Sequence, residues 1–161
     1  MADAVSNTSP LLYLHRLGIV EWLPELFDNT LTPDAVWNEL AEGEKLGYNV
    51  PQHQLYQWLM IKNPKSLPPK WVSLDLGAGE LAAMALALEH PDHILLLDDL
   101  LARRVAQTAG LTVWGTLRVI LEGKSAGLIK HVAPLLNEAE RAGLWMSEKI
   151  RRRVLKLANE Q

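Results

Sequence analysis

The chain has 161 residues, of which 48% are apolar and 22% charged, as in a globular protein of one domain. Its net charge of -3 provides no general attraction for nucleic acid, so contact with RNA or DNA would need a local basic patch. The absence of cysteine excludes disulfides, a thiolate zinc site and a cysteine nucleophile.

No segment of the sequence predicts a membrane span or a secretory leader. The longest apolar run, Leu81 to Leu88, is far shorter than the roughly 18 residues that a spanning helix needs. Residues 1–5 contain neither the basic nor the apolar part of a signal peptide. We therefore expect no membrane partner and a cytoplasmic location.

Short apolar segments alternate with amphipathic segments along most of the chain. Strands are expected at residues 4–6, 30–31, 59–62, 94–97 and 111–114. Helices are expected at residues 10–17, at 19–27, from 34, after 51, and at 81–89, 100–109, 117–122, 129–142 and 147–157.

Local signals support several of these boundaries. Pro10 is well placed to open the first helix, and Thr32 followed by Pro33 predicts a capped helix that starts at Asp34. The alanine-rich, apolar segment 81–89 predicts a helix packed closely on a sheet. Gly110 is a plausible stop for the helix before it.

Alternation of short apolar strands with helices predicts a three-layer α/β/α domain with a mostly parallel central sheet. We expect residues 1–161 to form one such domain, with residues 130–161 as a C-terminal helical tail. In sheets of this kind, ligands bind beyond the carboxyl ends of the strands.

Five places where a strand or turn leads into a helix carry an acidic, amide or hydroxyl side chain. Carboxylates gathered from separate strand ends can bind a hard cation, which prefers oxygen ligands. Most of these side chains are acidic, but the first is an amide without charge. The residues are Asn7, Glu39, Glu80, the pair Asp98 and Asp99, and Thr116.

The acids also have purely structural interpretations. One of Asp98 and Asp99 could cap the helix that starts near residue 100, while Asp99 has the i,i+4 spacing for an ion pair with Arg103. Glu80 could act only as a favourable carboxylate in the first turn of a helix. Two adjacent aspartates are nevertheless more than one cap requires.

The remaining candidates have equally simple alternatives. Glu39 could be a solvated helix residue, and Asn7 could form a turn or a helix cap through its own side chain. Thr116 could cap the helix that follows it. Thr8 and Ser9, which follow Asn7, could orient a water or contact a phosphate.

Several basic residues could contact RNA phosphate. They include Arg103 and Arg104 in the expected helix 100–109, and Lys124 after the helix 117–122. A further basic run lies in residues 149–156, although such runs are usually solvated helix faces.

Taken together, these segments resemble the PIN-domain superfamily, and most closely the PIN-like branch grouped with VapC-type toxins. The resemblance runs from Val5 to Ile129, with the segments in the order of the family. The matching segments are VSNTSPLLYLHRLG, TPDAVWNEL, LDLGAGELAAMALALE, ILLLDDLLARRVAQTAGL and VWGTLRVILEGKSAGLI.

The resemblance implies a ribonuclease that uses Mg²⁺ or Mn²⁺ bound in an acidic pocket, like the toxin of a type II toxin–antitoxin pair. It places catalytic roles on Asn7, Glu39, Glu80, Asp98, Asp99 and Thr116, and cation binding on Asn7, Glu80, Asp98 and Asp99. Asp98 is the better match to the fourth acid of the family. Substrate contacts are expected from Thr8, Ser9, Arg103, Arg104 and Lys124.

Asn7 departs from the family pattern, in which the first acid stands at this position. The neutral amide removes one negative charge, which lowers the expected cation affinity. Three interpretations stay open: natural variation of the site, a weakened nuclease, or an isosteric replacement of aspartate that disarmed the protein.

Two other functions compete with the nuclease. The first is a catalytically impaired PIN-like module that binds RNA or a protein partner such as an antitoxin. The second is a receiver-like signalling domain, which normally carries its acidic pair after the first strand, where this chain has Asn7.

A homodimer is also expected, because six tryptophans against one phenylalanine are many large rings for a small core. Trp22, Trp58 and Trp145 are the candidates for exposure, with ordinary core packing as the alternative for each.

Overall fold

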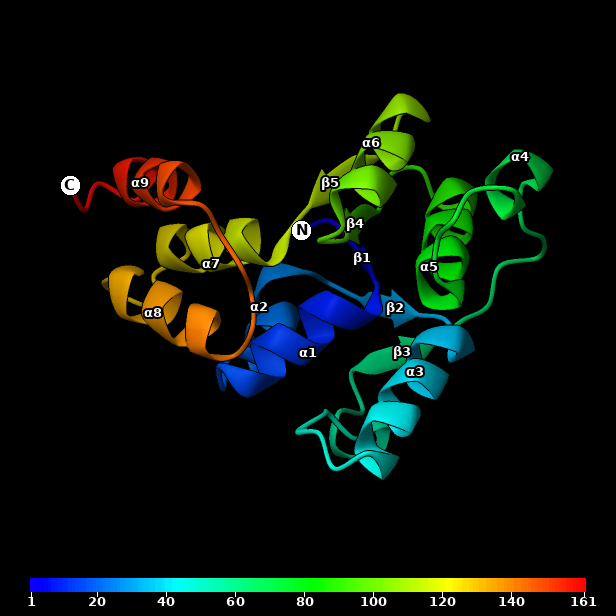
Figure 1. The fold of residues 1–161 in the computed structure, drawn as a ribbon, viewed down its shortest axis with the longest axis horizontal. Helices are drawn as coiled ribbons and strands as arrows, with labels where there is room; N and C mark the ends of the chain where they lie inside the picture. The colour runs from blue at the N-terminus through cyan, green and yellow to red at the C-terminus, as the bar shows by residue number, and fades with distance from the viewer.

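The computed structural model describes residues 1–161 and confirms the expected parallel sheet (Figure 1). All four pairs of neighbouring strands are parallel, in the order β3-β2-β1-β4-β5. The strands are β1 (Ala4–Ser6), β2 (Thr30–Thr32), β3 (Leu59–Ile61), β4 (Ile94–Leu96) and β5 (Thr112–Trp114).

Helices connect these strands and continue after the last one. They are α1 (Thr8–Arg16), η1 (Val20–Trp22), α2 (Leu23–Leu26), α3 (Asp34–Lys45), η2 (His53–Leu55), α4 (Pro69–Val72), α5 (Ala78–Glu89), α6 (Leu100–Thr108), α7 (Thr116–Ser125), α8 (Ala133–Arg141) and α9 (Glu148–Leu157). None of them is both long enough and apolar enough to cross a membrane.

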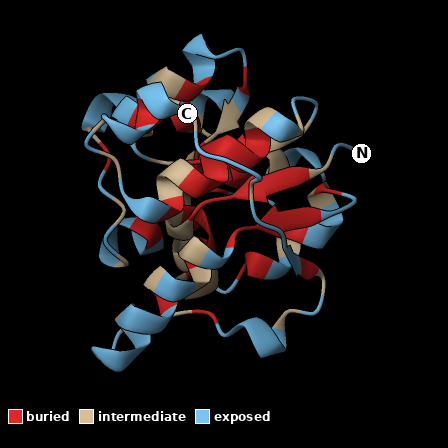
Figure 2. Ribbon diagram, turned by 90° about the vertical axis from the view of Figure 1, so that its right-hand side faces the viewer, coloured by how far each residue is buried: buried red, intermediate tan, exposed pale blue.

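The two faces of the sheet are covered by different helices, because successive residues of a strand point to opposite faces. Val5 and Leu95 pack with the apolar residues of α5 and α6 on one face. Ala4 and Leu96 pack on the other face with residues of α1, α7, α8 and α9. Figure 2 shows the buried residues gathered at the strands and the helix faces beside them. The three-layer α/β/α architecture predicted from the sequence is therefore confirmed.

The chain reverses its direction across the sheet at β1. It runs outward from β1 through β2 to β3, and then returns to the opposite side of β1 for β4 and β5. Ser6 pairs with Leu96, and the backbone N–H of Asn7 donates to the carbonyl of Leu96 at 3.0 Å. The crevice between the carboxyl ends of β1 and β4 is therefore the place where a fold of this kind binds ligands.

Some expected boundaries differ from the structure. Thr32 belongs to β2, and its hydroxyl donates to the carbonyl of Ser6 at 2.9 Å instead of capping α3. The position before α3 is occupied by Pro33. After Pro51 there is only the short turn η2, and the helix expected at 129–142 begins at Ala133. Competing tertiary contacts explain the first difference, because a strand hydrogen bond uses the hydroxyl.

Candidate active site

Asn7 lies directly after β1 at the crevice, with only 3% of its surface exposed. Its side chain makes no capping hydrogen bond to α1, and its amide oxygen Oδ1 has no hydrogen-bond partner. An unpaired buried acceptor costs on the order of 1–3 kcal/mol. The amide oxygen is therefore a free oxygen donor at the strand edge, and the capping interpretation does not describe it.

The carboxylate of Glu39 joins three helices at this edge. From α3, its Oε2 accepts a hydrogen bond of 2.7 Å from the hydroxyl of Thr8, in the first turn of α1. Its Oε1 accepts one of 2.7 Å from the backbone N–H of Gly79, in the first turn of α5. The negative charge thus lies against two helix N-termini, where it is electrostatically favoured. Glu39 is partly buried and is not the freely solvated helix residue of the simple interpretation.

The absence of a side chain at Gly79 is what lets the Glu39 carboxylate come so close. A β-carbon at Gly79 would lie 2.6 Å from Oε1 and 2.8 Å from Oε2 of Glu39. The sequence argument did not identify this role of Gly79. The glycine-rich turn before Glu80 was the available signal, because a close approach of backbone to another group commonly needs glycine.

Glu80 lies one residue further along α5 and faces the same space. Its Oε1 accepts a hydrogen bond of 3.1 Å from the N–H of Gly77. A methyl group at Gly77 would lie 3.5 Å from Oε1 of Glu80 and 3.8 Å from Oε1 of Glu39. Burial raises the pKa of the Glu80 carboxyl and the charges of Asp99 and Glu39 raise it further, against the Gly77 hydrogen bond, which lowers it. The charges of Glu39 on α3 and Asp99 in the β4–α6 turn therefore both act on Glu80.

The two adjacent aspartates point to different neighbours. Asp99 is exposed, and its Oδ2 accepts a hydrogen bond of 2.9 Å from the N–H of Ala102, so it caps α6 as the structural interpretation expected. Its charge also acts on Glu80. Its second carboxylate oxygen has no hydrogen bond within the protein.

Asp98 is instead held by the turn between β5 and α7. Its Oδ1 accepts from the N–H of Thr116 at 2.7 Å and its Oδ2 from the hydroxyl of Thr116 at 2.8 Å. Burial raises the pKa of Asp98, while the hydrogen bonds from Thr116 and the nearby Arg103 lower it. Asp98 therefore anchors α7 to the sheet edge, and Asp99 is the aspartate whose charge raises the pKa of Glu80.

The structure distributes the expected substrate residues unevenly. The hydroxyl of Thr8 is bound to Glu39, and Ser9 lies partly buried in the same turn of α1. Arg103 and Asp98 lie on the same side of Gly115: a β-carbon at Gly115 would lie 3.2 Å from Nη1 of Arg103 and 3.2 Å from Oδ1 of Asp98.

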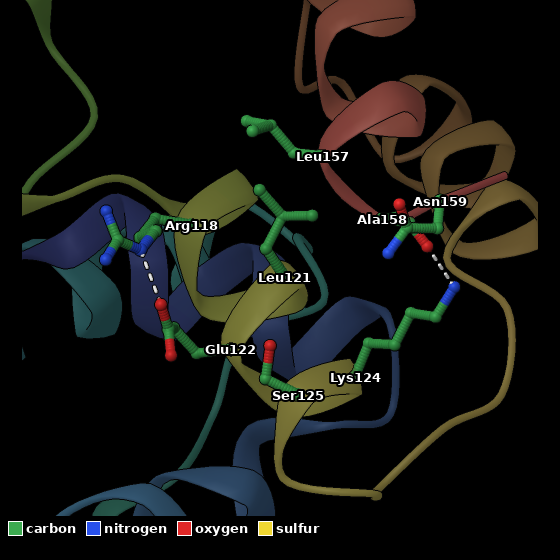
Figure 3. A pocket seen from close by; sticks show the side chains of 8 residues that line it. All are labelled: Arg118, Leu121, Glu122, Lys124, Ser125, Leu157, Ala158 and Asn159. Carbon is green, nitrogen blue, oxygen red and sulfur yellow. Dashed lines mark hydrogen bonds and ion pairs between the residues drawn. The ribbon is translucent and has the colours of Figure 1, made fainter. Parts of the chain in front are cut away.

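The other two expected contacts lie elsewhere. Arg104 is exposed and lines a separate hollow with Lys70 and Trp71. Lys124 is eight residues beyond Thr116 on α7, which is roughly 12 Å along a helix. Its ammonium binds the carboxylate of Glu160 at 2.9 Å and the carbonyl of Ala158, and Figure 3 shows it directed to the end of α9. Lys124 therefore holds the C-terminal segment against α7, and its contact with the substrate stays a prediction.

The set of donors at the edge fits a hard divalent cation in chemical type. Asn7, Glu39, Glu80 and Asp99 offer only oxygen atoms, as Mg²⁺ and Mn²⁺ prefer. The free amide oxygen of Asn7 and the mutual repulsion around Glu80 are both features that a cation would relieve. In the present arrangement, however, no three acidic or histidine side chains lie close enough together to hold one ion.

A family model described as a PIN domain matches residues 3–160, which is nearly the entire chain. No curated protein matches the sequence.

Proposed function

Because this chain belongs to the PIN-domain family, whose fold is of the nuclease type, we propose that it is a ribonuclease dependent on Mg²⁺ or Mn²⁺. The observation that carries the proposal is the placement of oxygen groups at the switch point of the sheet. Glu39 is hydrogen-bonded to Thr8, which follows Asn7, and to Gly79, which precedes Glu80, and the buried amide oxygen of Asn7 is unpaired. Phosphodiester hydrolysis at oxygen-ligated cations uses sites of this composition.

In the proposed site, Glu80 and Asp99 would hold the cation together with the amide oxygen of Asn7. Such a cation, when bound, lowers the pKa of a water and neutralises charge that develops on the phosphate. Glu39 keeps its hydrogen bonds to Thr8 and Gly79, and so holds α1, α3 and α5 in register around the site. Asp98 and Thr116 position α7 at the other wall.

The raised pKa of Glu80 suits this role. Burial of the Glu80 charge, and to a smaller extent its repulsion by Asp99 and Glu39, oppose ionisation, and a bound cation would offset both effects. The neutral amide of Asn7 weakens the same attraction by one charge. We therefore expect weak cation binding and slow cleavage in the chain as it stands.

A second function is favoured by Asn7 and by the absence of three acids around one point. In this alternative the chain is an impaired PIN-like module that binds RNA or a protein partner without cutting. In both cases the biological setting we propose is that of a toxin with an antitoxin partner, in the cytoplasm and as a homodimer. A binder would be indifferent to Mg²⁺, whereas the nuclease requires a cation.

The test is incubation of single-stranded RNA with the protein and Mn²⁺, comparing the unchanged chain with Glu80→Gln and Asn7→Asp. The nuclease predicts loss of cleavage in Glu80→Gln and a gain in Asn7→Asp. If neither substitution changes the cleavage rate, the acidic edge is not the catalytic centre. Cleavage should also stop when EDTA removes the cation.

A further inference from the structure

A groove of about 440 Å³ lies between the start of α7 and the C-terminal helices, with Asp98 in its lining. One wall carries Asp98, Arg103 and Leu117, and the other carries Trp145, Ile150 and Arg153. Asp98 belongs to the edge described above, so the groove adjoins that edge at Asp98, while Asn7, Glu80 and Asp99 lie outside its lining. A polymer bound at the acidic site would meet this groove next.

Trp145 is the most exposed large apolar side chain of the molecule, with 83% of its surface open to solvent. It lies in the connection between α8 and α9, and the next residue, Met146, is buried and anchors that connection. The other tryptophans are buried or partly buried, so the core does not lack room for rings. An indole held open at a groove offers a flat face on which an unpaired base can stack.

The charges of the groove complement phosphate. Three arginines line it, and Asp98 is its only carboxylate. Arg103 and Arg153 make no ion pair or hydrogen bond with another side chain, whereas Arg118 is bound to Glu122 at 2.7 Å. Two guanidinium groups are thus available for phosphate contacts, for which their planar donor arrangement is well suited.

We propose that this groove binds the single-stranded part of an RNA next to the phosphate that is cleaved. Trp145 stacks on one base, and Arg103 and Arg153 contact phosphates on either side of it. A paired base cannot stack in this way, so the groove selects unpaired RNA over duplex. The inference rests on the proposed function for its substrate, but the binding itself needs no cation.

The experiment is a binding titration of labelled single-stranded RNA in EDTA, which keeps cleavage out of the measurement. Trp145→Ala should weaken binding about tenfold or more, as loss of a base–aromatic stack does, and Trp145→Phe should weaken it less. Arg153→Gln should weaken it several-fold. The matched control is Lys149→Gln, which removes an exposed positive charge from the same helix outside the groove.

The variants at exposed positions should keep the thermal unfolding temperature of the unchanged chain. Duplex RNA serves as the competitor and should bind less tightly than single-stranded RNA, because its bases are paired. Equal binding by Trp145→Ala and the unchanged chain would overturn the proposal, as would an equal loss in Lys149→Gln and Arg153→Gln. Absence of any RNA binding at low salt would also overturn it, and binding of a protein instead would assign the groove to that partner.

The outcomes separate this inference from the nuclease proposal. If RNA binds through Trp145 but is not cut with Mn²⁺, the nuclease proposal is refuted and the proposal of an RNA-binding groove is supported. If Trp145→Ala cuts RNA with an unchanged KM, the proposal of an RNA-binding groove is refuted and the nuclease proposal is supported.

Discussion

Replacement of Gly79 by alanine would displace the Glu39 carboxylate without removing any charge. The new β-carbon would lie 2.6 Å from Oε1 and 2.8 Å from Cδ of Glu39. The carboxylate must then move by roughly 1 Å to reach van der Waals distance. Because both of its oxygens are hydrogen-bonded, to Gly79 and Thr8, that movement stretches or breaks both bonds.

The effects on stability and on activity should differ. Lost hydrogen bonds cost about 0.5–1.5 kcal/mol each, while alanine in a helix is favoured over glycine by about 1 kcal/mol. The free energy of unfolding should therefore change little. A displacement of about 1 Å in a group that positions a site can lower the rate on the order of 100-fold, and we expect a loss of that order in RNA cleavage.

The matched control is Gly77→Ala, two residues earlier. Its β-carbon would lie 3.5 Å from Glu80 and 3.8 Å from Glu39, which is ordinary contact, and its backbone is extended. Cleavage of single-stranded RNA with Mn²⁺ and thermal unfolding should be measured for both variants. If Gly79→Ala cleaves as fast as Gly77→Ala, the position of Glu39 is irrelevant to the reaction and the reasoning about this site is wrong.

Three further predictions concern charge and packing. Asn7→Asp adds a negative charge, whose attraction to a dication about 4 Å away is worth several kcal/mol before desolvation at an effective dielectric of about 20. Calorimetric titration should therefore show that Asn7→Asp binds Mn²⁺ more tightly than the unchanged chain. An unchanged affinity would contradict cation binding at this position. The pKa of Glu80 is raised in the folded state, so ionised Glu80 opposes folding. As the pH rises from acidic to neutral, the stability of Glu80→Gln should therefore increase relative to that of the unchanged chain. Chemical denaturation that shows the opposite trend would refute the direction of the pKa shift. Gly123→Ala would push a β-carbon into the ring of Trp22 and should destabilise the protein by about 1–3 kcal/mol in urea unfolding; a gain in stability would mean that the ring moves aside.

Much of the fold follows from local sequence signals. Apolar segments such as 94–97 are too short for a helix and are buried on both sides, so they predict strands of a parallel sheet. The apolar segment 81–89 lies within α5, which packs between α3 and the sheet. Boundaries were less predictable where one residue had two possible hydrogen-bond partners, as with Thr32, whose hydroxyl binds Ser6.

The site was only partly accessible from the sequence. That Asn7, Glu80 and the two aspartates stand where strands or turns lead into helices is a local property, and it sufficed to predict that they meet at one edge. Local sequence signals do not reveal that Gly79 and Thr8 donate hydrogen bonds to Glu39, because the three residues lie on three different helices. The sequence made Trp145 one of three candidates for exposure, and only the structure singles out its ring as open to solvent.

The sequence by itself determined that this chain forms a parallel α/β domain with acidic groups at the strand ends, because periodicity and turn chemistry act between near neighbours. Only the tertiary structure decided that Asp99 caps α6 through Ala102 while Asp98 binds Thr116, and that Lys124 is bound to Glu160. Adjacent side chains carry the same local signals but leave the backbone in different directions. Their partners come from segments that the register of the sheet brings beside them.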